Sequence, residues 1–341
     1  MSRRSRSVLR VVGFLVGIVA TVVGVKWTGV GAIRDALSRA GVNIAWMFAA
    51  YAAGTVVGAI PWRALLPHAV RPTWNATITS RFAASGLNAL LPFFGLGESV
   101  RLLWLRRGER TPGLAALVVD RLLFLAAGLP LLVIAALASI RVPNLPHSYR
   151  VGVLVSAAII GVAVAAVAVG AARGQLVGRL RWALLLFGVP PRIEKTEANG
   201  DGARDAGGEP VDRALNALLT GSPAPLAGGF ALHLCARVLL AAEIYAGLRI
   251  LGAHVGALEM LVFIAIPIAL SVIGTFVPGQ IGLQEGASAL IAAALGIGPA
   301  TGFALVFLQR LRQLVFVPLA GLLIALVPSG PSSTSDPQRS S

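Results

Sequence analysis

Long apolar stretches that contain no charged side chain constrain the fold of this chain more than any other feature. Six such stretches lie between Arg39 and Arg63, Arg121 and Arg141, Arg150 and Arg173, Glu259 and Glu285, Glu285 and Arg310, and Arg312 and Asp336. A bilayer core about 30 Å thick needs about 20 apolar residues per helix, and most of these stretches meet that length. Because lipid offers no partner to a free backbone N–H or C=O group, such spanning segments are helices. The sequence therefore predicts an all-α polytopic membrane protein.

Six runs are predicted to be full transmembrane helices: Val11–Val25, Val42–Ile60, Leu114–Ala138, Val151–Ala172, Gly229–Ile250 and Ala300–Val327. Two further apolar segments are broken, so the expected total is about six to eight helices. The first run follows four arginines, as the apolar core of a signal peptide does. No small-x-small cleavage site follows it, and we therefore expect a retained first helix.

The polar segments indicate one transmembrane domain, an internal loop and a C-terminal tail. Residues 1–328 are predicted to form one transmembrane domain. Within it, Arg173–Pro225 is charged, and its middle has too few apolar residues to pack a core, which predicts a flexible cytoplasmic loop. Residues 329–341 are rich in serine and proline, which predicts a disordered tail.

The net charge of +15 is best explained as a topology signal. In a soluble chain it would favour nucleic-acid binding, but the apolar runs leave no basic face with interleaved aromatic residues. The Lys/Arg bias instead places the N-terminus, the Arg173–Pro225 loop and the C-terminal tail in the cytoplasm. Arg34, Arg39, Arg141 and Arg150 fall on the other side and weaken this bias slightly.

The sequence contains no recognisable catalytic or metal-binding motif. Cys235 is the single cysteine, and the four histidines show no ligand spacing. A Ser/His/Asp set, a Gly-Lys-Ser/Thr phosphate loop and a zinc-binding HExxH are all missing from the sequence. We therefore expect no metal, no cofactor and no enzyme activity.

Two apolar segments are interrupted by proline and glycine. The segment Phe82–Leu105 breaks at Pro92 and at the two glycines after it. Each arm has about ten residues, or about 15 Å of helix, which is half a bilayer. Because Arg81 and Arg106 flank the two ends, the segment is predicted to be a re-entrant hairpin that enters and leaves on one side.

The segment Met260–Gly296 repeats this design, with its break at Pro278 and the glycines that follow. Both breaks end on a glutamate, "PFFGLGE" on Glu98 and "PGQIGLQE" on Glu285. A similar strip follows each of them, "ALVVDRLL" and then "ALVFLQRL". If the second break is also a hairpin, the two halves form an inverted-topology repeat, whose broken helices mark a transporter's binding site. The arm Met260–Val277 is also long enough to span alone, which would raise the helix count.

Ionisable groups inside these segments are candidates for a polar site at mid-membrane, since each costs about 2.5–3.5 kcal/mol there on insertion scales. Glu98 and Glu285 either bind a ligand or are stabilised by a helix dipole. Arg121 and Arg310 either pair with these carboxylates, hold a phosphate or extend to the interface. Asn88 is either a polar ligand or a helix cap. Arg237 and Glu243 lie six residues apart, so they are not neighbours on a helix and carry little weight.

The broken segments resemble a known family. "NALLPFFGLGESVR" at Asn88–Arg101 resembles its Asn, Pro, Gly-x-Gly-Glu and Arg pattern. "VVDRLLFL" at Val118–Leu125 resembles the acidic-Arg-Leu strip that follows. "PGQIGLQEGA" at Pro278–Ala287, followed by Arg310, resembles its Pro-Gly-x-x-Gly-x-x-Glu element. Over roughly residues 8–327 the chain resembles the lysylphosphatidylglycerol synthase transmembrane family, the flippase-like membrane domain.

The resemblance implies a multi-pass protein of the bacterial or archaeal inner membrane that moves a lipid between leaflets. We expect an anionic or phosphate-bearing lipid, either aminoacylated or polyprenyl-linked. The expected binding residues are Asn88, Glu98, Arg101, Asp120, Arg121, Glu285 and Arg310. The chain extends only a little beyond its last span, so we expect no synthase domain, and this leaves the identity of the lipid open. The alternative is a non-transporting scaffold for a membrane synthase or glycosyltransferase partner.

Overall fold

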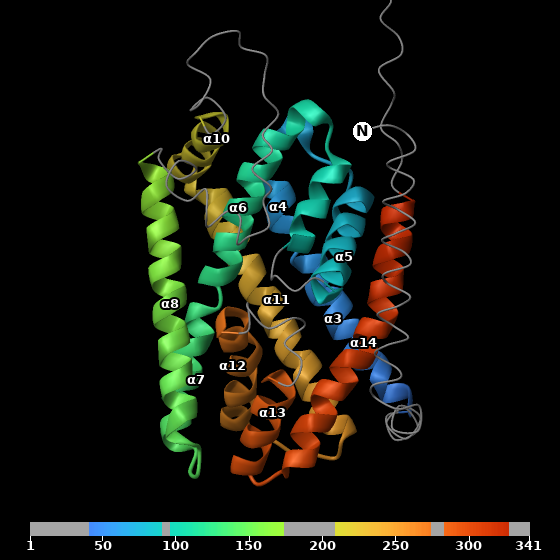
Figure 1. The fold of residues 1–341 in the computed structure, drawn as a ribbon, viewed down its shortest axis with the longest axis vertical. Coiled ribbons are helices and arrows are strands. Elements are labelled where there is room, and N and C mark those ends of the chain that lie inside the picture. Colours follow the sequence, from blue (N-terminus) through green and yellow to red (C-terminus); the bar gives the residue numbers. More distant parts are fainter. Residues whose placement is uncertain (1–40, 91–95, 174–208, 274–282, 327–341) are drawn as a thin grey trace, which may run out of the picture.

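The computed structural model describes residues 41–90, 96–173, 209–273 and 283–326, and these residues contain helices and no strand (Figure 1). Five helical stretches are long and apolar enough to cross a membrane: Gly41–Leu65, Arg110–Arg141, His147–Gly170, Pro223–Ile250 and Pro299–Ala325. They confirm the all-α polytopic class and correspond to five of the six predicted spans. The predicted span Val11–Val25 lies outside the described residues.

The first half of the chain contains η1 (Gly41–Asn43), α3 (Ile44–Val57), α4 (Ile60–Leu65), η2 (His68–Val70), α5 (Trp74–Leu90), η3 (Leu96–Trp104), η4 (Arg107–Glu109), α6 (Arg110–Ala126), α7 (Leu129–Arg141) and α8 (His147–Ala172). The second half contains α10 (Glu209–Thr220), α11 (Pro223–Ile250), α12 (Ala257–Ile273), α13 (Leu283–Ala294) and α14 (Pro299–Ala325). Proline stands in the first turn of α4, α7, α11 and α14, where its missing N–H leaves no bond unmade.

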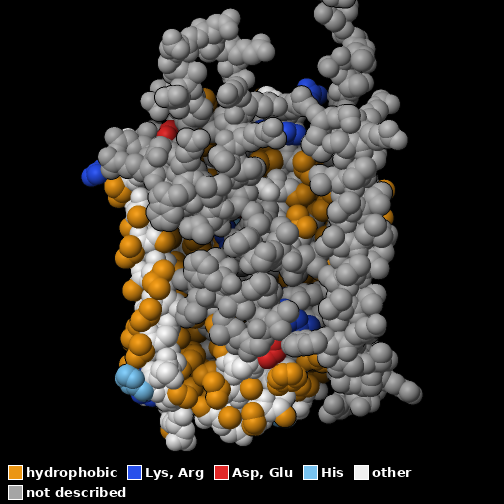
Figure 2. Space-filling model, viewed as in Figure 1, with side chains coloured by type: hydrophobic (Ala, Val, Ile, Leu, Met, Phe, Trp, Pro, Cys, Tyr) orange, Lys and Arg blue, Asp and Glu red, His pale blue; other side chains and the backbone are white. Residues whose placement is uncertain are grey.

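The outer surface of the bundle is apolar. Helix α8 is apolar nearly all round, and Leu154, Ile159 and Val162 are among its exposed side chains. Figure 2 shows such side chains along the edge where α8 lies. A helix that is hydrophobic all round and still exposed on one side is suited to contact with lipid.

The two halves of the chain repeat one arrangement in opposite directions (Figure 1). Helices α3 and α11 run in opposite directions and pack on one another. Helix α5 packs on α14, and its counterpart α12 packs on α7. In Figure 1, α6 and α7 descend through the bundle, whereas α14 rises. The described helices therefore have the inverted arrangement that the paired breaks predict.

Glycines allow the closest of these helix contacts. A Cβ atom on Gly86 in α5 would lie 2.3 Å from Ala320 Cβ in α14. One on Gly302 in α14 would lie 2.1 Å from the backbone oxygen of Ser288 in α13. Between helices in lipid the hydrophobic effect is weak, so small residues that bring backbones together supply the packing energy.

The arms of both broken segments pack on one another, α5 on η3 and α12 on α13. In Figure 1, α5 descends from the upper end and η3 returns to it, while α12 and α13 do the same from the lower end. The breaks at 91–95 and 274–282 lie outside the described residues. The prediction that Pro92–Gly97 and Pro278–Gly282 meet near the membrane centre therefore stays a prediction.

Arg81 was predicted to precede the first arm, whereas the structure places it inside that arm. Helix α5 begins earlier, at Trp74, so Arg81 lies about two turns inside it. The hydroxyls of the polar residues before Arg81 are satisfied by backbone carbonyls one turn earlier. Thr77 Oγ1 donates to Thr73 O at 2.9 Å, and Ser80 Oγ donates to Thr77 O at 2.8 Å.

The end of the predicted loop Arg173–Pro225 is helical instead. Residues 174–208 lie outside the described residues, but α10 is an amphipathic helix that packs on α6 and α8. Val211 and Leu215 are buried in a core with Trp62 and Leu117. The overall composition of the loop concealed this short apolar stripe, whose residues recur at helical spacing.

Candidate functional site

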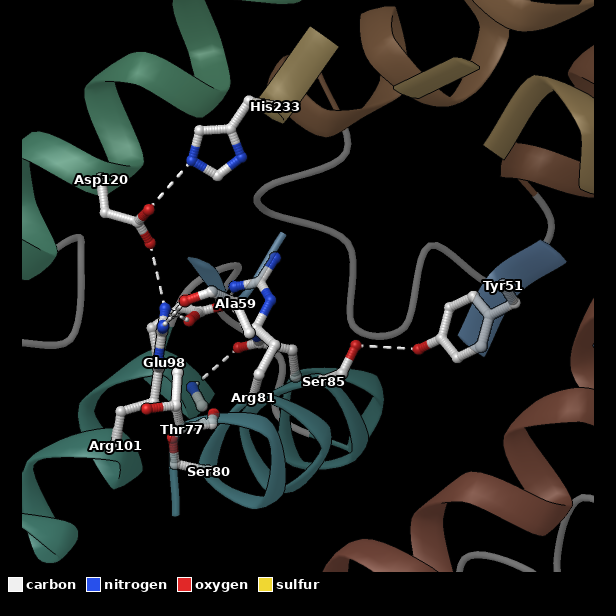
Figure 3. Close-up of polar contacts among 12 residues, drawn as sticks. Tyr51, Ala59, Thr77, Ser80, Arg81, Ser85, Glu98, Arg101, Asp120 and His233 are labelled. Carbon is white, nitrogen blue, oxygen red and sulfur yellow. Dashed lines mark hydrogen bonds and ion pairs between the residues drawn. The ribbon is translucent and has the colours of Figure 1, made fainter. Parts of the chain in front are cut away.

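Five ionisable side chains from four helices meet inside the bundle (Figure 3). Arg81 Nη1 donates to Glu98 Oε1 at 2.7 Å, and Arg101 Nη1 donates to Glu98 Oε2 at 3.3 Å. Arg101 Nη1 also donates to Asp120 Oδ2 at 3.0 Å, and His233 Nε2 lies 2.9 Å from Asp120 Oδ1. We call these five residues the Glu98 network. It ties together α5, η3, α6 and α11.

Asn88 joins the two arms of the first broken segment. Its Oδ1 atom accepts from Gly97 N at 2.7 Å, and its Nδ2 atom donates to Glu98 Oε1 at 3.2 Å. A Cβ atom on Gly97 would lie 2.5 Å from Ala84 O, so only glycine allows this close approach. Asn88 therefore caps the second arm and also orients the Glu98 carboxylate, and its role as a polar ligand stays a prediction.

Arg101 lies at the centre of the Glu98 network and is fully buried. Its guanidinium carbon lies 4.4 Å from the centroid of the Trp62 ring, and Nη2 lies 3.5 Å from Ala59 O, between α3 and α4. Removing one member of such a buried charge set strongly destabilises the fold, because it leaves an uncompensated charge. The network therefore fixes where the first broken segment sits against α4 and α6.

A second group lies in the lower half, between α13 and α14. Arg310 donates from Nε and Nη2 to Glu285 Oε1, at 3.1 and 3.0 Å. Gln284 Nε2 donates to Gln309 Oε1 at 3.2 Å. The structure thus pairs Arg310 with Glu285, one of the partners considered for it. The Arg310 side chain is 22% exposed, more than any other side chain in the ion pairs described.

The two groups occupy corresponding places in the repeat. Glu98 follows the first break and interacts electrostatically with the Asp120–Arg121 strip, while Glu285 follows the second break and contacts the Gln309–Arg310 strip. Gln309 stands where the first half has Asp120. The first half therefore has a carboxylate that the second half replaces with a neutral amide. Six of the seven predicted site residues belong to these two groups or contact them, and the seventh, Arg121, lies on the Phe124 ring. A cavity common to both Glu98 and Glu285 stays a prediction.

A third group joins Glu243 of α11 to Arg312 of α14. Arg312 Nη1 donates to Glu243 Oε1, and the guanidinium carbon lies 3.8 Å from the centroid of the Tyr51 ring. The Tyr51 hydroxyl is 2.8 Å from Ser85 Oγ. Sequence reasoning gave Glu243 little weight because only Arg237 was considered as its partner. The actual partner is 69 positions away in the chain, which no local pattern reveals.

A fourth group surrounds Phe124, near the end of α6. The guanidinium carbons of Arg121 and Arg237 lie 4.7 and 4.2 Å from the centroid of its ring. His233 meets the same ring edge-on, with the centroids 5.6 Å apart. Arg237 is 4% exposed, and its Nη2 atom donates to Phe124 O at 2.7 Å. A guanidinium on an aromatic face gains about 2 kcal/mol when desolvated, but here one ring serves two cations.

Arginines outnumber carboxylates in these four groups. The arginines are Arg81, Arg101, Arg121, Arg237, Arg310 and Arg312, and the carboxylates are Glu98, Asp120, Glu243 and Glu285. The excess is two positive charges, before any proton on His233. The described residues contain no group of three or more His, Cys, Asp or Glu side chains that could hold a metal ion. The arrangement is therefore suited to attracting an anion.

A family model described as the lysylphosphatidylglycerol synthase TM region matches residues 10–321 of the chain. The match covers both broken segments and all four charged groups. No curated protein and no solved structure matches the chain.

Proposed function

Because this chain belongs to the lysylphosphatidylglycerol synthase transmembrane family, we propose that it moves an anionic or phosphate-bearing lipid between the leaflets of a bacterial inner membrane. The family establishes a membrane protein with a lipid-related function, and the transport step is our proposal. The lipid is aminoacylated or polyprenyl-linked. The protein changes no covalent bond in it, and its N-terminus is cytoplasmic.

The observation that carries the proposal is the excess of two positive charges in the buried groups. A charge in hydrocarbon costs about 2.5–3.5 kcal/mol on insertion scales. A stably folded membrane protein does not need such an excess, and an anionic headgroup would neutralise it. A headgroup that crosses the core also needs its own charge matched, and arginine is suited to phosphate because it offers a planar array of donors.

The inverted repeat gives this charge a place in a transport cycle. Transporters with inverted repeats bind their substrate between the halves, at broken helices. Arg121 and Arg310 occupy corresponding positions in the two halves, and we assign them to the headgroup. Glu98 and Glu285 would hold these arginines in place, while Asn88, Arg101 and Asp120 would position Glu98. The lipid tails would stay in the apolar phase throughout.

Transfer measured in reconstituted vesicles tests the proposal. Fluorescent phosphatidylglycerol and a polyprenyl phosphate would be incorporated, and a membrane-impermeant quencher would report the fraction in the outer leaflet. Arg310→Ala and Glu285→Gln should slow transfer at least tenfold at normal expression. The matched control is Arg249→Ala, an exposed arginine at the end of α11, which should transfer lipid as the wild type does.

Two results would oppose the proposal. If folded Arg310→Ala and Glu285→Gln variants both moved every lipid as fast as the wild type, the assignment of the headgroup site would be wrong. If the wild type moved no lipid, the alternative of a scaffold for a synthase or glycosyltransferase would replace transport. The scaffold has no need for Glu285 and Arg310 inside the bilayer.

A further inference from the structure

The long helix Arg110–Arg141 is broken near its middle, between α6 and α7. Pro130 stands in the first turn of α7, and Gly128 N donates to Leu125 O at 2.9 Å. In a regular helix this N–H would donate to the carbonyl four residues back, which is Phe124 O. The break therefore leaves Phe124 O without its usual partner. With 17 residues in α6 and 13 in α7, it lies far from both ends of the span.

Arg237 of α11 enters this break. Its Nη2 atom donates to Phe124 O at 2.7 Å and so replaces the missing N–H. Gly128 makes room for it, since a Cβ atom there would lie 3.1 Å from Arg237 Nη2 and 3.1 Å from Ile268 Cγ2. Sequence and fold thus place one guanidinium at a fixed point near the middle of the span Arg110–Arg141.

The carbonyl satisfies one donor of Arg237 but leaves its charge unmatched. A guanidinium has five N–H donors, and Arg237 Nε is buried without a hydrogen-bond partner among the described residues. No Asp or Glu in the described ranges forms an ion pair with Arg237. A neutral donor would satisfy the break equally well, so the positive charge of Arg237 needs another explanation.

A second guanidinium lies on the same ring. Arg121 belongs to α6 and Arg237 to α11, and both guanidinium carbons are within 4.7 Å of the centroid of Phe124. Two like charges on one ring repel one another inside a bundle, and an anion placed near both would reduce the repulsion. A tetrahedral phosphate has enough oxygens to accept from two planar donor arrays.

We propose that Arg237 and Arg121, positioned by Phe124 at the break between α6 and α7, form a binding site for a phosphate group. The inference rests on the proposed function and makes it more specific, because it assigns the phosphate to the first half of the repeat and adds Arg237 to the headgroup site. The same chemistry would accept the phosphate of a lipid or free phosphate. Arg237 is a binding residue here, and Gly128 is a positioning residue.

Native mass spectrometry of the purified full chain tests the site directly. The protein in detergent would be titrated with dioleoylphosphatidylglycerol, with dioleoylglycerol, which has the same tails without phosphate, and with inorganic phosphate. The wild type should retain the phospholipid at least tenfold better than dioleoylglycerol. Arg237→Gln should lower phospholipid affinity about tenfold, the equivalent of one charge-assisted contact, and leave dioleoylglycerol binding unchanged. Arg249→Gln on the same helix is the matched control and should bind as the wild type does.

Two further variants cover the case in which Arg237→Gln does not fold. Arg237→Lys keeps the charge but loses the planar donor array, so it should bind the phospholipid several-fold more weakly than the wild type does. Gly128→Ala keeps every charge but crowds Arg237, and it should weaken phospholipid binding several-fold. Wild-type affinity in folded Arg237→Lys and Gly128→Ala would overturn the site, as would wild-type affinity in folded Arg237→Gln.

The binding and transfer assays separate this site from the proposed function. Binding that depends on Arg237 without transfer in vesicles would keep the site and reject transport. Transfer in the wild type without any effect of Arg237 on binding would keep transport and reject the site. If inorganic phosphate bound through Arg237 and displaced the phospholipid, the ligand would be a free anion, whereas the absence of competition would identify a lipid.

Discussion

Replacing Arg312 with methionine measures what a buried ion pair contributes to this bundle. Glu243 is fully buried, and Arg312 Nη1 donates to its Oε1 atom. The Oε2 atom has no hydrogen-bond partner among the described residues, and Arg312 is the one ion-pair partner they provide. Methionine keeps much of the apolar stem but leaves the carboxylate charge uncompensated. We expect Arg312→Met to lower the free energy of unfolding by about 3–5 kcal/mol.

The opposite substitution, Glu243→Gln, should cost less. The Arg312 side chain is 13% exposed, and its guanidinium carbon lies 3.8 Å from the centroid of the Tyr51 ring. Solvent and the ring therefore compensate part of the charge that Glu243→Gln leaves behind. We expect a loss of about 1–3 kcal/mol. The double variant should lose about 1–3 kcal/mol less stability than the sum of the two single losses. The reason is that neither charge is then left without its counter-ion.

Reversible unfolding in mixed micelles measures these differences. Helical circular dichroism would be followed as the mole fraction of sodium dodecyl sulfate increases. Arg249→Met, an exposed arginine on α11, is the control and should change stability by less than about 0.5 kcal/mol. The reasoning would be refuted if Arg312→Met cost no more than Arg249→Met, or if the losses of the double variant were simply additive.

Packing and topology support four further predictions. Gly302→Ala places a Cβ atom 2.1 Å from a backbone oxygen of α13, so it should lower stability by about 1–3 kcal/mol in the same unfolding assay. Gly152→Ala meets nothing within 4 Å in its helix and should be neutral or stabilising by up to about 1 kcal/mol. Leu215→Asp should detach α10 from α6, because Leu215 is buried in their core, and faster proteolysis around residue 210 in the folded protein would reveal it. In a Cys235→Ser background, single cysteines in the loop between α8 and α10 should resist an impermeant thiol reagent added to intact cells, and labelling from outside would reject the cytoplasmic assignment.

Local sequence was sufficient to predict the helical class and most of the spans. The reason is the solvent: lipid forces every spanning backbone into a helix, so length and hydropathy alone give the answer. The two breaks could also be found locally, since proline and glycine act on their own turn. The repeated glutamate after each break predicted the inverted arrangement that α5, α12 and their following helices adopt.

The structure corrected the sequence-based prediction where the average composition of a long segment concealed a short apolar pattern. The charged composition of Arg173–Pro225 predicted a loop, yet Val211, Leu215, Leu218 and Leu219 recur at helical spacing within it. A window of 12 residues, the length of α10, would have shown this stripe.

Only the tertiary structure decided which charges meet. His233 and Arg237 are each 113 positions from their partners in α6, and Arg312 is 69 positions from Glu243. Helical periodicity determines which face a residue occupies, but it does not determine which helix approaches that face. The sequence by itself could therefore state that charges lie in the membrane and need partners. The partners were chosen by the packing of α11 and α14 against the first half, because an ion pair inside lipid forms only where two helices bring its groups within about 4 Å.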